Sequence, residues 1–178
     1  MINFKNNKKL FFAIGSTIAF FLYISLILGK VSECFSLEGK NNSLGLSFYY
    51  TLDMVQNFFE LRNQEQLVCY DKFLKIWDVF FSVIYTSMYA AWIAYFLKNK
   101  TILVIIPIFA MVFDWSENYI EILMLNSYSL LNSISERLVL LGSGINSLKW
   151  IFATLTYLII IAGIIFNLKN FFTKSNTK

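Results

Sequence analysis

The chain has 178 residues, of which 57% are hydrophobic and 15% are charged, a composition that argues against an ordinary water-soluble domain. It contains no histidine, which excludes Ser-His and Cys-His catalysis and every zinc site that needs a histidine ligand. The formal net charge is +4, but no basic face or nucleic-acid-binding motif accompanies it, so we expect no nucleic-acid partner.

Four segments are candidates to cross a lipid bilayer, because a helix needs about 20 mostly apolar residues to span a hydrocarbon core about 30 Å thick. They are residues 10–28, 76–97, 102–123 and 148–168. The first is longer than the apolar part of a signal peptide, about 7 to 15 residues, and we interpret it as a retained span. The sequence therefore predicts an all-α membrane protein in which residues 1–178 form a single four-transmembrane-helix bundle.

The segments between the spans, residues 29–75 and 126–147, are expected to be structured and to carry short helices on the outer face. Residues 52–62 have polar side chains on one helical face and apolar side chains on the other. Asn63 and Gln66 have the spacing of a capping box, which predicts that the second long helix begins near Gln64.

The segment before the fourth span has helix signals of its own. Residues 133–136 (SISE) resemble a second capping box, and Gly142 is a typical helix stop. Asn146 or Ser147 would then cap the last span. The sequence thus predicts a short separate helix between the third and fourth spans.

The two cysteines, Cys34 and Cys69, both lie in the first of these outer segments. An oxidising exterior would allow a disulfide between them, and two free thiols are the alternative. No Cys-x-x-Cys motif is present, so the sequence gives no support to thiol redox catalysis.

Lysines indicate the orientation, because short cytoplasmic loops are rich in Lys and Arg. Three acid-free segments, before the first span, between the second and third, and after the fourth, contain Lys5, Lys8, Lys9, Lys98, Lys100, Lys169, Lys174 and Lys178. We predict that both termini are cytoplasmic and that Lys40 and Asn132 face outward.

The third span carries a stripe of polar residues at positions i, i+3, i+4 and i+7, which share one helical face. They are Asp114, Glu117, Asn118 and Glu121. At about 1.5 Å per residue from the cytoplasmic side, the stripe lies in the outer third of the membrane. Carboxylates at that depth must face protein or water, since their exposure to lipid is costly.

Two other spans place polar residues at a similar depth. Asp78, Ser82, Tyr85 and Tyr89 share a face of the second span, and Lys149 opens the fourth. The candidate functional cluster is Asp78, Asp114, Glu117, Asn118 and Lys149, with Tyr85 and Glu121 as secondary members. The same residues also fit a hydrogen-bonded cluster that only fixes helix register. They do not define a metal site.

Three features together resemble a group of small, uncharacterised four-helix membrane proteins of bacteria. They are Asp78 followed by Tyr85, residues 113–118 (FDWSEN) with their D-x-x-E-N element, and residues 147–150 (SLKW). The resemblance implies a location in the bacterial cytoplasmic membrane. It implies no activity.

Three functions fit this pattern, and a structural or accessory membrane protein that contacts a membrane-protein partner or a second copy is favoured over an enzyme. The first alternative is a component of a small ion- or proton-coupled transporter. The second is a membrane-embedded enzyme that acts on a lipid or isoprenoid through Asp114 and Glu117. Only this enzyme would involve a cofactor, Mg²⁺ held by the two carboxylates.

Overall fold

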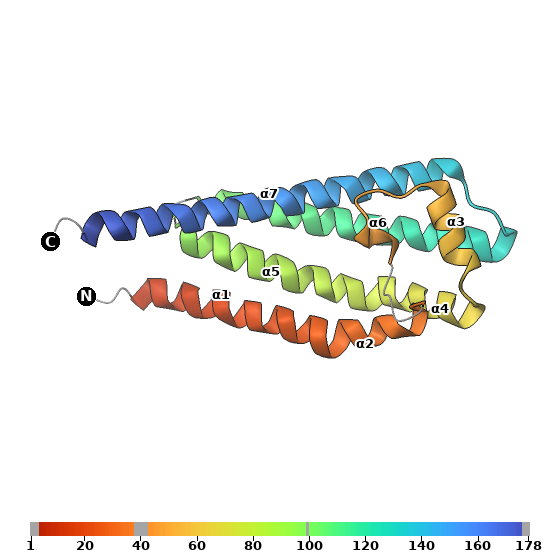
Figure 1. Cartoon of the computed structure of the whole chain (residues 1–178), viewed down its shortest axis with the longest axis horizontal. Coiled ribbons are helices and arrows are strands. Elements are labelled where there is room, and N and C mark those ends of the chain that lie inside the picture. The colour runs from red at the N-terminus through yellow and green to blue at the C-terminus, as the bar shows by residue number, and fades with distance from the viewer. Residues whose placement is uncertain (1–3, 38–42, 99, 176–178) are drawn as a thin grey trace.

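The computed structural model describes residues 4–37, 43–98 and 100–175, and in this part of the chain the regular structure is helical. Four long helical stretches lie side by side (Figure 1). The first consists of α1 (Phe4–Tyr23), the π turn η1 (Ile24–Leu28), α2 (Gly29–Ser32) and the 3-10 turn η2 (Glu33–Phe35). The others are α4 (Gln64–Lys72) with the π turn η4 (Phe73–Trp77) and α5 (Asp78–Phe96), then η5 (Thr101–Val104) with α6 (Ile105–Leu131), and finally α7 (Glu136–Ser175).

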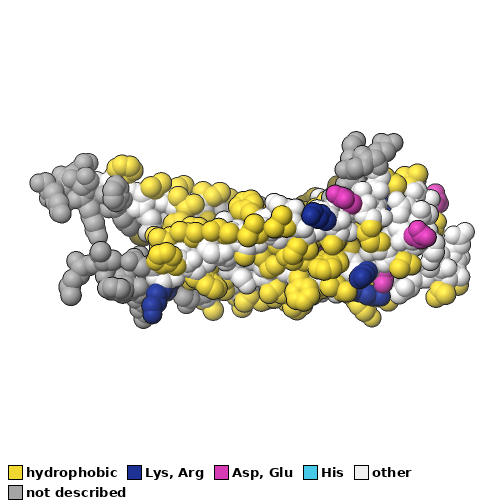
Figure 2. Space-filling view, turned by 90° about the horizontal axis from the view of Figure 1, so that it is seen from below, with side chains coloured by type: hydrophobic (Ala, Val, Ile, Leu, Met, Phe, Trp, Pro, Cys, Tyr) yellow, Lys and Arg dark blue, Asp and Glu magenta, His cyan; other side chains and the backbone are white. Residues whose placement is uncertain are grey.

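All four stretches are long and apolar enough to cross a membrane, as the sequence predicts. They cover Lys8–Phe35, Gln64–Phe96, Ile102–Leu131 and Glu136–Lys169. Each is longer than the apolar segment expected from the sequence, because polar turns extend the helices beyond the apolar core. Figure 2 shows hydrophobic side chains over most of the length of one face, with acidic side chains gathered toward one end.

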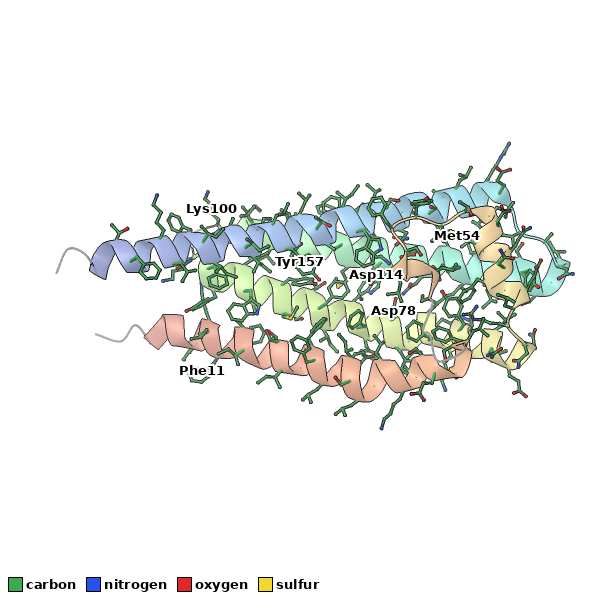
Figure 3. All side chains as sticks on the ribbon, viewed as in Figure 1. Phe11, Met54, Asp78, Lys100, Asp114 and Tyr157 are labelled. Carbon is green, nitrogen blue, oxygen red and sulfur yellow. A yellow bond between two sulfur atoms is a disulfide. The ribbon has the colours of Figure 1, made fainter. Side chains whose placement is uncertain are left out.

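The helices pack in a defined order. α6 packs along α7, α1 packs along α5, and α5 also contacts α6 and α7, whereas α1 and α7 have little direct contact. Both ends of the chain lie at one end of the bundle, here called the terminal end, and Lys100 also lies toward it (Figures 1 and 3). Helix α3 (Leu52–Glu60) lies at the opposite end, here called the α3 end. Of the residues used to predict orientation, Lys40 and Lys178 fall outside the described part of the chain.

Helix α3 confirms the predicted amphipathic helix. The Thr51 hydroxyl caps it by accepting a hydrogen bond of 3.3 Å from the Met54 backbone N–H. Val55 and Phe59 are fully buried, while the polar face is largely exposed. At the start of α4, Asn63 and Gln66 form the capping box that their spacing indicates.

A disulfide between Cys34 and Cys69 joins η2 to α4, with the two Cα atoms 6.3 Å apart. Buried Arg62 strengthens the same junction: its Nε donates to the Phe35 carbonyl at 2.8 Å. Its guanidinium lies 3.5 Å from the centre of the Phe58 ring, a favourable cation–π geometry. The end of the first long helix is therefore held against the second.

The prediction of a separate helix between α6 and α7 is wrong. α6 ends at Leu131, Asn132 takes a left-handed conformation with φ 51°, and α7 begins at Glu136. The backbone N–H groups of Leu138 and Val139 donate to the carbonyl of Ser135. Ser135 and not Ser133 therefore occupies the N-cap position of α7.

Gly142, Asn146 and Ser147 lie inside α7 and do not end or start it. Gly142 allows the Tyr50 side chain to pack closely against α7, because a Cβ at this position would lie 2.5 Å from the Tyr50 hydroxyl. The Asn146 side chain donates to the Ser47 carbonyl at 2.7 Å, and Ser147 donates to the Phe48 carbonyl at 3.1 Å. These residues hold the segment before α3 against α7.

A second glycine, Gly163 on α7, allows α5 to pack closely. A Cβ at Gly163 would lie 2.8 Å from the Phe96 Cβ, whereas a Cβ at Gly144 meets no atom within 4 Å. We expect Gly163→Ala to lower the free energy of unfolding by about 1–3 kcal/mol through overpacking. Gly144→Ala is the control and should be neutral or stabilising, since Ala favours helix more than Gly. Thermal unfolding in detergent measures both, and equal melting temperatures would contradict this packing.

Candidate functional site

Lys149 is the centre of the polar cluster. Its Nζ lies 3.3 Å from Asp114 Oδ1, contacts Glu117 Oε2, and donates to the Gly45 carbonyl at 3.1 Å. Lys149 therefore forms ion pairs with two carboxylates, and it donates hydrogen bonds to Glu117 and to the Gly45 carbonyl. The Gly45 carbonyl also accepts from Trp150 Nε1 at 3.2 Å, which fixes the loop above the cluster.

Two further pairs surround this ion pair. The Tyr85 hydroxyl donates to Asp114 Oδ2 at 3.0 Å, so both oxygens of the buried Asp114 carboxylate have partners. Asn118 donates to Asp78 Oδ2 at 2.8 Å. Asp78 Oδ1 has no hydrogen-bond partner among the described residues. Asp78 is also only half-buried, which leaves it the most available acid of the cluster.

Glu121 belongs to a second polar group nearer the α3 end. It is fully buried, and the Tyr70 hydroxyl donates to its Oε2. Since the Tyr70 proton is used in this way, Ser43, 3.2 Å away, donates to the Tyr70 oxygen. Burial raises the pKa of the nearby Tyr50 hydroxyl, and the Glu121 and Glu117 carboxyls raise it further. Tyr50 therefore remains protonated at any ordinary pH.

The π turn η4 explains why Tyr70 joins the site. Eight residues of regular α-helix would rotate Tyr70 away from the face of Asp78. A π turn contains more residues per revolution, and η4 lies between the two residues, so it brings Tyr70 back to the inner face. The Tyr23 hydroxyl donates to the Trp77 carbonyl of this turn at 2.8 Å, which links it to the end of α1.

Beside the cluster is a partly open cavity of about 380 Å³. Its polar wall is formed mainly by Asp78, Asp114, Asn118 and Lys149, and Ser32 and Ser43 also line the cavity. The remaining walls are mainly apolar and rich in aromatic rings, among them Phe20, Phe81, Tyr85, Tyr89, Trp150 and Tyr157. Figure 3 shows that Asp78 and Asp114 lie on neighbouring helices, with Tyr157 of α7 next along the bundle toward the terminal end.

The structure brings all five residues of the candidate cluster together, with Tyr85 bound to Asp114 and with Glu121 one helical turn beyond Glu117. Sequence reasoning missed Gly45, Tyr70 and Trp150. No spacing rule could have found Gly45, since it lies in the short 3-10 turn η3 (Leu44–Leu46), far in sequence from Lys149. The π turn breaks the periodicity that would reveal Tyr70. Comparisons of this chain with known protein families, with curated proteins and with solved structures found no match.

Proposed function

We propose that this chain is an integral membrane protein that binds an amphipathic ligand in the cavity between its helices. The observation that carries the proposal is a cavity of about 380 Å³ with one charged wall and otherwise mainly aromatic and aliphatic walls. Its size falls in the range of small-molecule sites, about 300–1,000 Å³, which are typically apolar with a few convergent polar groups. The polar wall would bind the head of the ligand, and the apolar walls its chain.

The helix packing supports access to this cavity from the bilayer. Phe20, Ile24 and Leu28 line it from the first helical stretch, and Ala153 and Tyr157 line it from α7. These two stretches have little direct contact with each other. A chain bound in the cavity could therefore extend sideways between them into the lipid.

The competing functions account for less of the structure. A structural or accessory role explains a buried polar cluster but does not require a cavity beside it. For the enzyme, Asp114 and Glu117 both form ion pairs with Lys149, so binding Mg²⁺ or transferring a proton through this pair would require the ion pairs to be disrupted. For the transporter, residues 102–113 of the third stretch contain no polar side chain that could continue a path toward the terminal end.

We further propose that the terminal end is cytoplasmic and that the protein lies in a bacterial cytoplasmic membrane, as the lysine pattern and the resemblance imply. A cysteine placed at Asn132 should react with an impermeant maleimide in intact cells, and one placed at the exposed Lys98 should react only after the membrane is broken. Cys34 and Cys69 are paired and need no replacement. Labelling of the Lys98→Cys variant in intact cells would overturn this orientation. Asn99, beside it, lies outside the described residues.

The binding proposal is tested by filling the cavity. Ala153 lines it, whereas Ala162 on the same helix faces outward. Purified protein in maltoside micelles is mixed with hexadecyl amphiphiles that have cationic, neutral and anionic heads, and native mass spectrometry measures which are retained. We expect the wild type and Ala162→Phe to retain at least one of them, and Ala153→Phe to retain none. Equal retention by all three proteins would show that the cavity is not the binding site.

A further inference from the structure

We propose that the ligand of this cavity is a cation, a long-chain ammonium compound whose head group binds Asp78 among aromatic rings. This inference rests on the proposed function and adds to it the chemical class of the ligand. Three charged side chains, those of Asp78, Asp114 and Lys149, line the cavity, and their existing ion pairs and hydrogen bonds determine which head group can bind.

Lys149 is not available to an anionic head group. Its ammonium already forms ion pairs with Asp114 and Glu117 and donates to the Gly45 carbonyl. A phosphate or carboxylate could bind Lys149 only by displacing one of these partners, two of which are carboxylates in a buried environment. Leaving such a charge buried and unpaired is costly.

Asp78 presents the opposite chemistry. One of its oxygens accepts from Asn118 at 2.8 Å, and the other has no hydrogen-bond partner among the described residues. Asn118 is neutral, so no residue that the structure describes forms an ion pair with Asp78. The cavity therefore offers a carboxylate acceptor without a bound counter-charge.

The balance of acidic and basic groups around the cavity also favours a positively charged head group. The polar cluster and the second polar group around Glu121 together contain four carboxyl groups, those of Asp78, Asp114, Glu117 and Glu121. They contain one ammonium group, that of Lys149. Because Asp114 and Glu117 share Lys149, no ammonium is left to neutralise Asp78, and an ionised Asp78 gives the cavity wall a negative potential that attracts cations and repels anions.

The aromatic lining adds a second kind of cation recognition. Phe20 lies 5.6 Å from Phe81, Phe81 lies 5.4 Å from Tyr85, and Tyr85 lies 5.7 Å from Tyr89, measured between ring centres. All four rings line the cavity. Phe81 and Tyr85 follow Asp78 by three and seven residues on the same helix face, so the rings and the carboxylate can contact one head group together. Ammonium groups bind the faces of aromatic rings, and most strongly where water is excluded.

The apolar remainder of the ligand follows from the position of the cavity. Leu28, Ile24 and Phe20 line the cavity from the first helical stretch, which contributes none of the charged residues of the wall. A methylene chain placed there would replace lipid or water contacts with helix contacts, whereas a small hydrophilic amine would leave this surface uncovered. The geometry thus favours a membrane-borne ammonium compound over a free small amine.

The experiment uses the full chain in maltoside micelles, which have neither charge nor amine, and three chain-matched probes: hexadecyltrimethylammonium, hexadecanol and hexadecyl sulfate. Equilibrium binding of radiolabelled probe gives the affinities, with micelles alone subtracted. We expect the ammonium probe to bind at least about tenfold more tightly than the other two. Tetramethylammonium should not displace it, and displacement at equal concentration would assign the site to a free small amine.

Asp78→Asn keeps the size of the side chain and removes its charge, and it should weaken ammonium binding by on the order of tenfold while leaving hexadecanol binding unchanged. Asp53→Asn, an exposed change on α3 with the same effect on net charge, is the control and should change neither. The melting temperature of each variant shows whether it folds, and Asp78→Glu provides a second variant that should retain ammonium binding.

The outcomes separate this inference from the function on which it rests. If Ala153→Phe abolishes binding but the three probes bind equally, or Asp78→Asn has no effect, the cavity binds amphiphiles and the cationic class is wrong. A preference for hexadecyl sulfate would also overturn the inference. If Ala153→Phe changes nothing for any probe, the proposed function itself fails.

Discussion

Replacing Lys149 by methionine is expected to lower the free energy of unfolding by about 3–5 kcal/mol, the cost of breaking a buried ion pair by removing one partner. The ammonium is the counter-ion of both Asp114 and Glu117, and both acids are almost completely buried. Methionine fills a similar volume, so the decrease in the free energy of unfolding arises from the unpaired carboxylates and not from a new cavity. Chemical or thermal unfolding of the purified protein in detergent measures it.

Two comparisons make this prediction specific. Lys75→Met removes an ion pair with Asp71 of 2.7 Å that is half exposed at the lysine, and such a surface pair contributes only about 0–1 kcal/mol. Combining Lys149→Met with Glu117→Gln should lower the free energy of unfolding by less than the sum of the two single changes. The second change removes one of the carboxylates that the first leaves unpaired. A loss at Lys149 no larger than that at Lys75 would contradict the buried ion-pair cluster.

Replacing Cys34 and Cys69 by serine is expected to lower the free energy of unfolding by roughly 2–4 kcal/mol. The bond closes a loop with a sequence separation of 35 residues, and its loss enlarges the conformational freedom of the unfolded chain. It also releases the junction at which Phe35, a residue lining the cavity, packs against Tyr70 at 4.9 Å between ring centres. We therefore expect both the melting temperature and the affinity for the probes to fall.

A reductant provides the control for this second prediction. It should lower the melting temperature of the wild type toward that of the double serine variant, and it should leave the variant itself unchanged. Mass spectrometry of protein purified in the presence of a thiol-blocking reagent gives the redox state directly. A wild type that is alkylated at both cysteines without prior reduction would show that the bond does not form in the cell.

The segment around Gly142 shows where local sequence rules fail. Gly, Asn and Ser in succession are common at helix ends, yet α7 continues through all of them. Their roles come from a neighbour distant in sequence: Gly142 makes space for Tyr50, and Asn146 and Ser147 donate to the backbone of residues 47 and 48. Polar residues that hydrogen-bond to the backbone of a neighbouring loop have the same local sequence pattern as residues that cap a helix.

The sequence by itself determined the four long apolar helices, the amphipathic helix α3, the capping box at Asn63, and which polar residues share a helix face. These features follow from periodicity and from contacts within a few residues, which the chain encodes locally. Only the tertiary structure decided that Lys149 binds Asp114 and Glu117 together, that it donates to the Gly45 carbonyl, and that an aromatic cavity opens beside Asp78. The physical reason is that helix packing and the path of residues 43–50 over the bundle bring together side chains about 30 to 105 positions apart, and no local rule determines which surfaces meet.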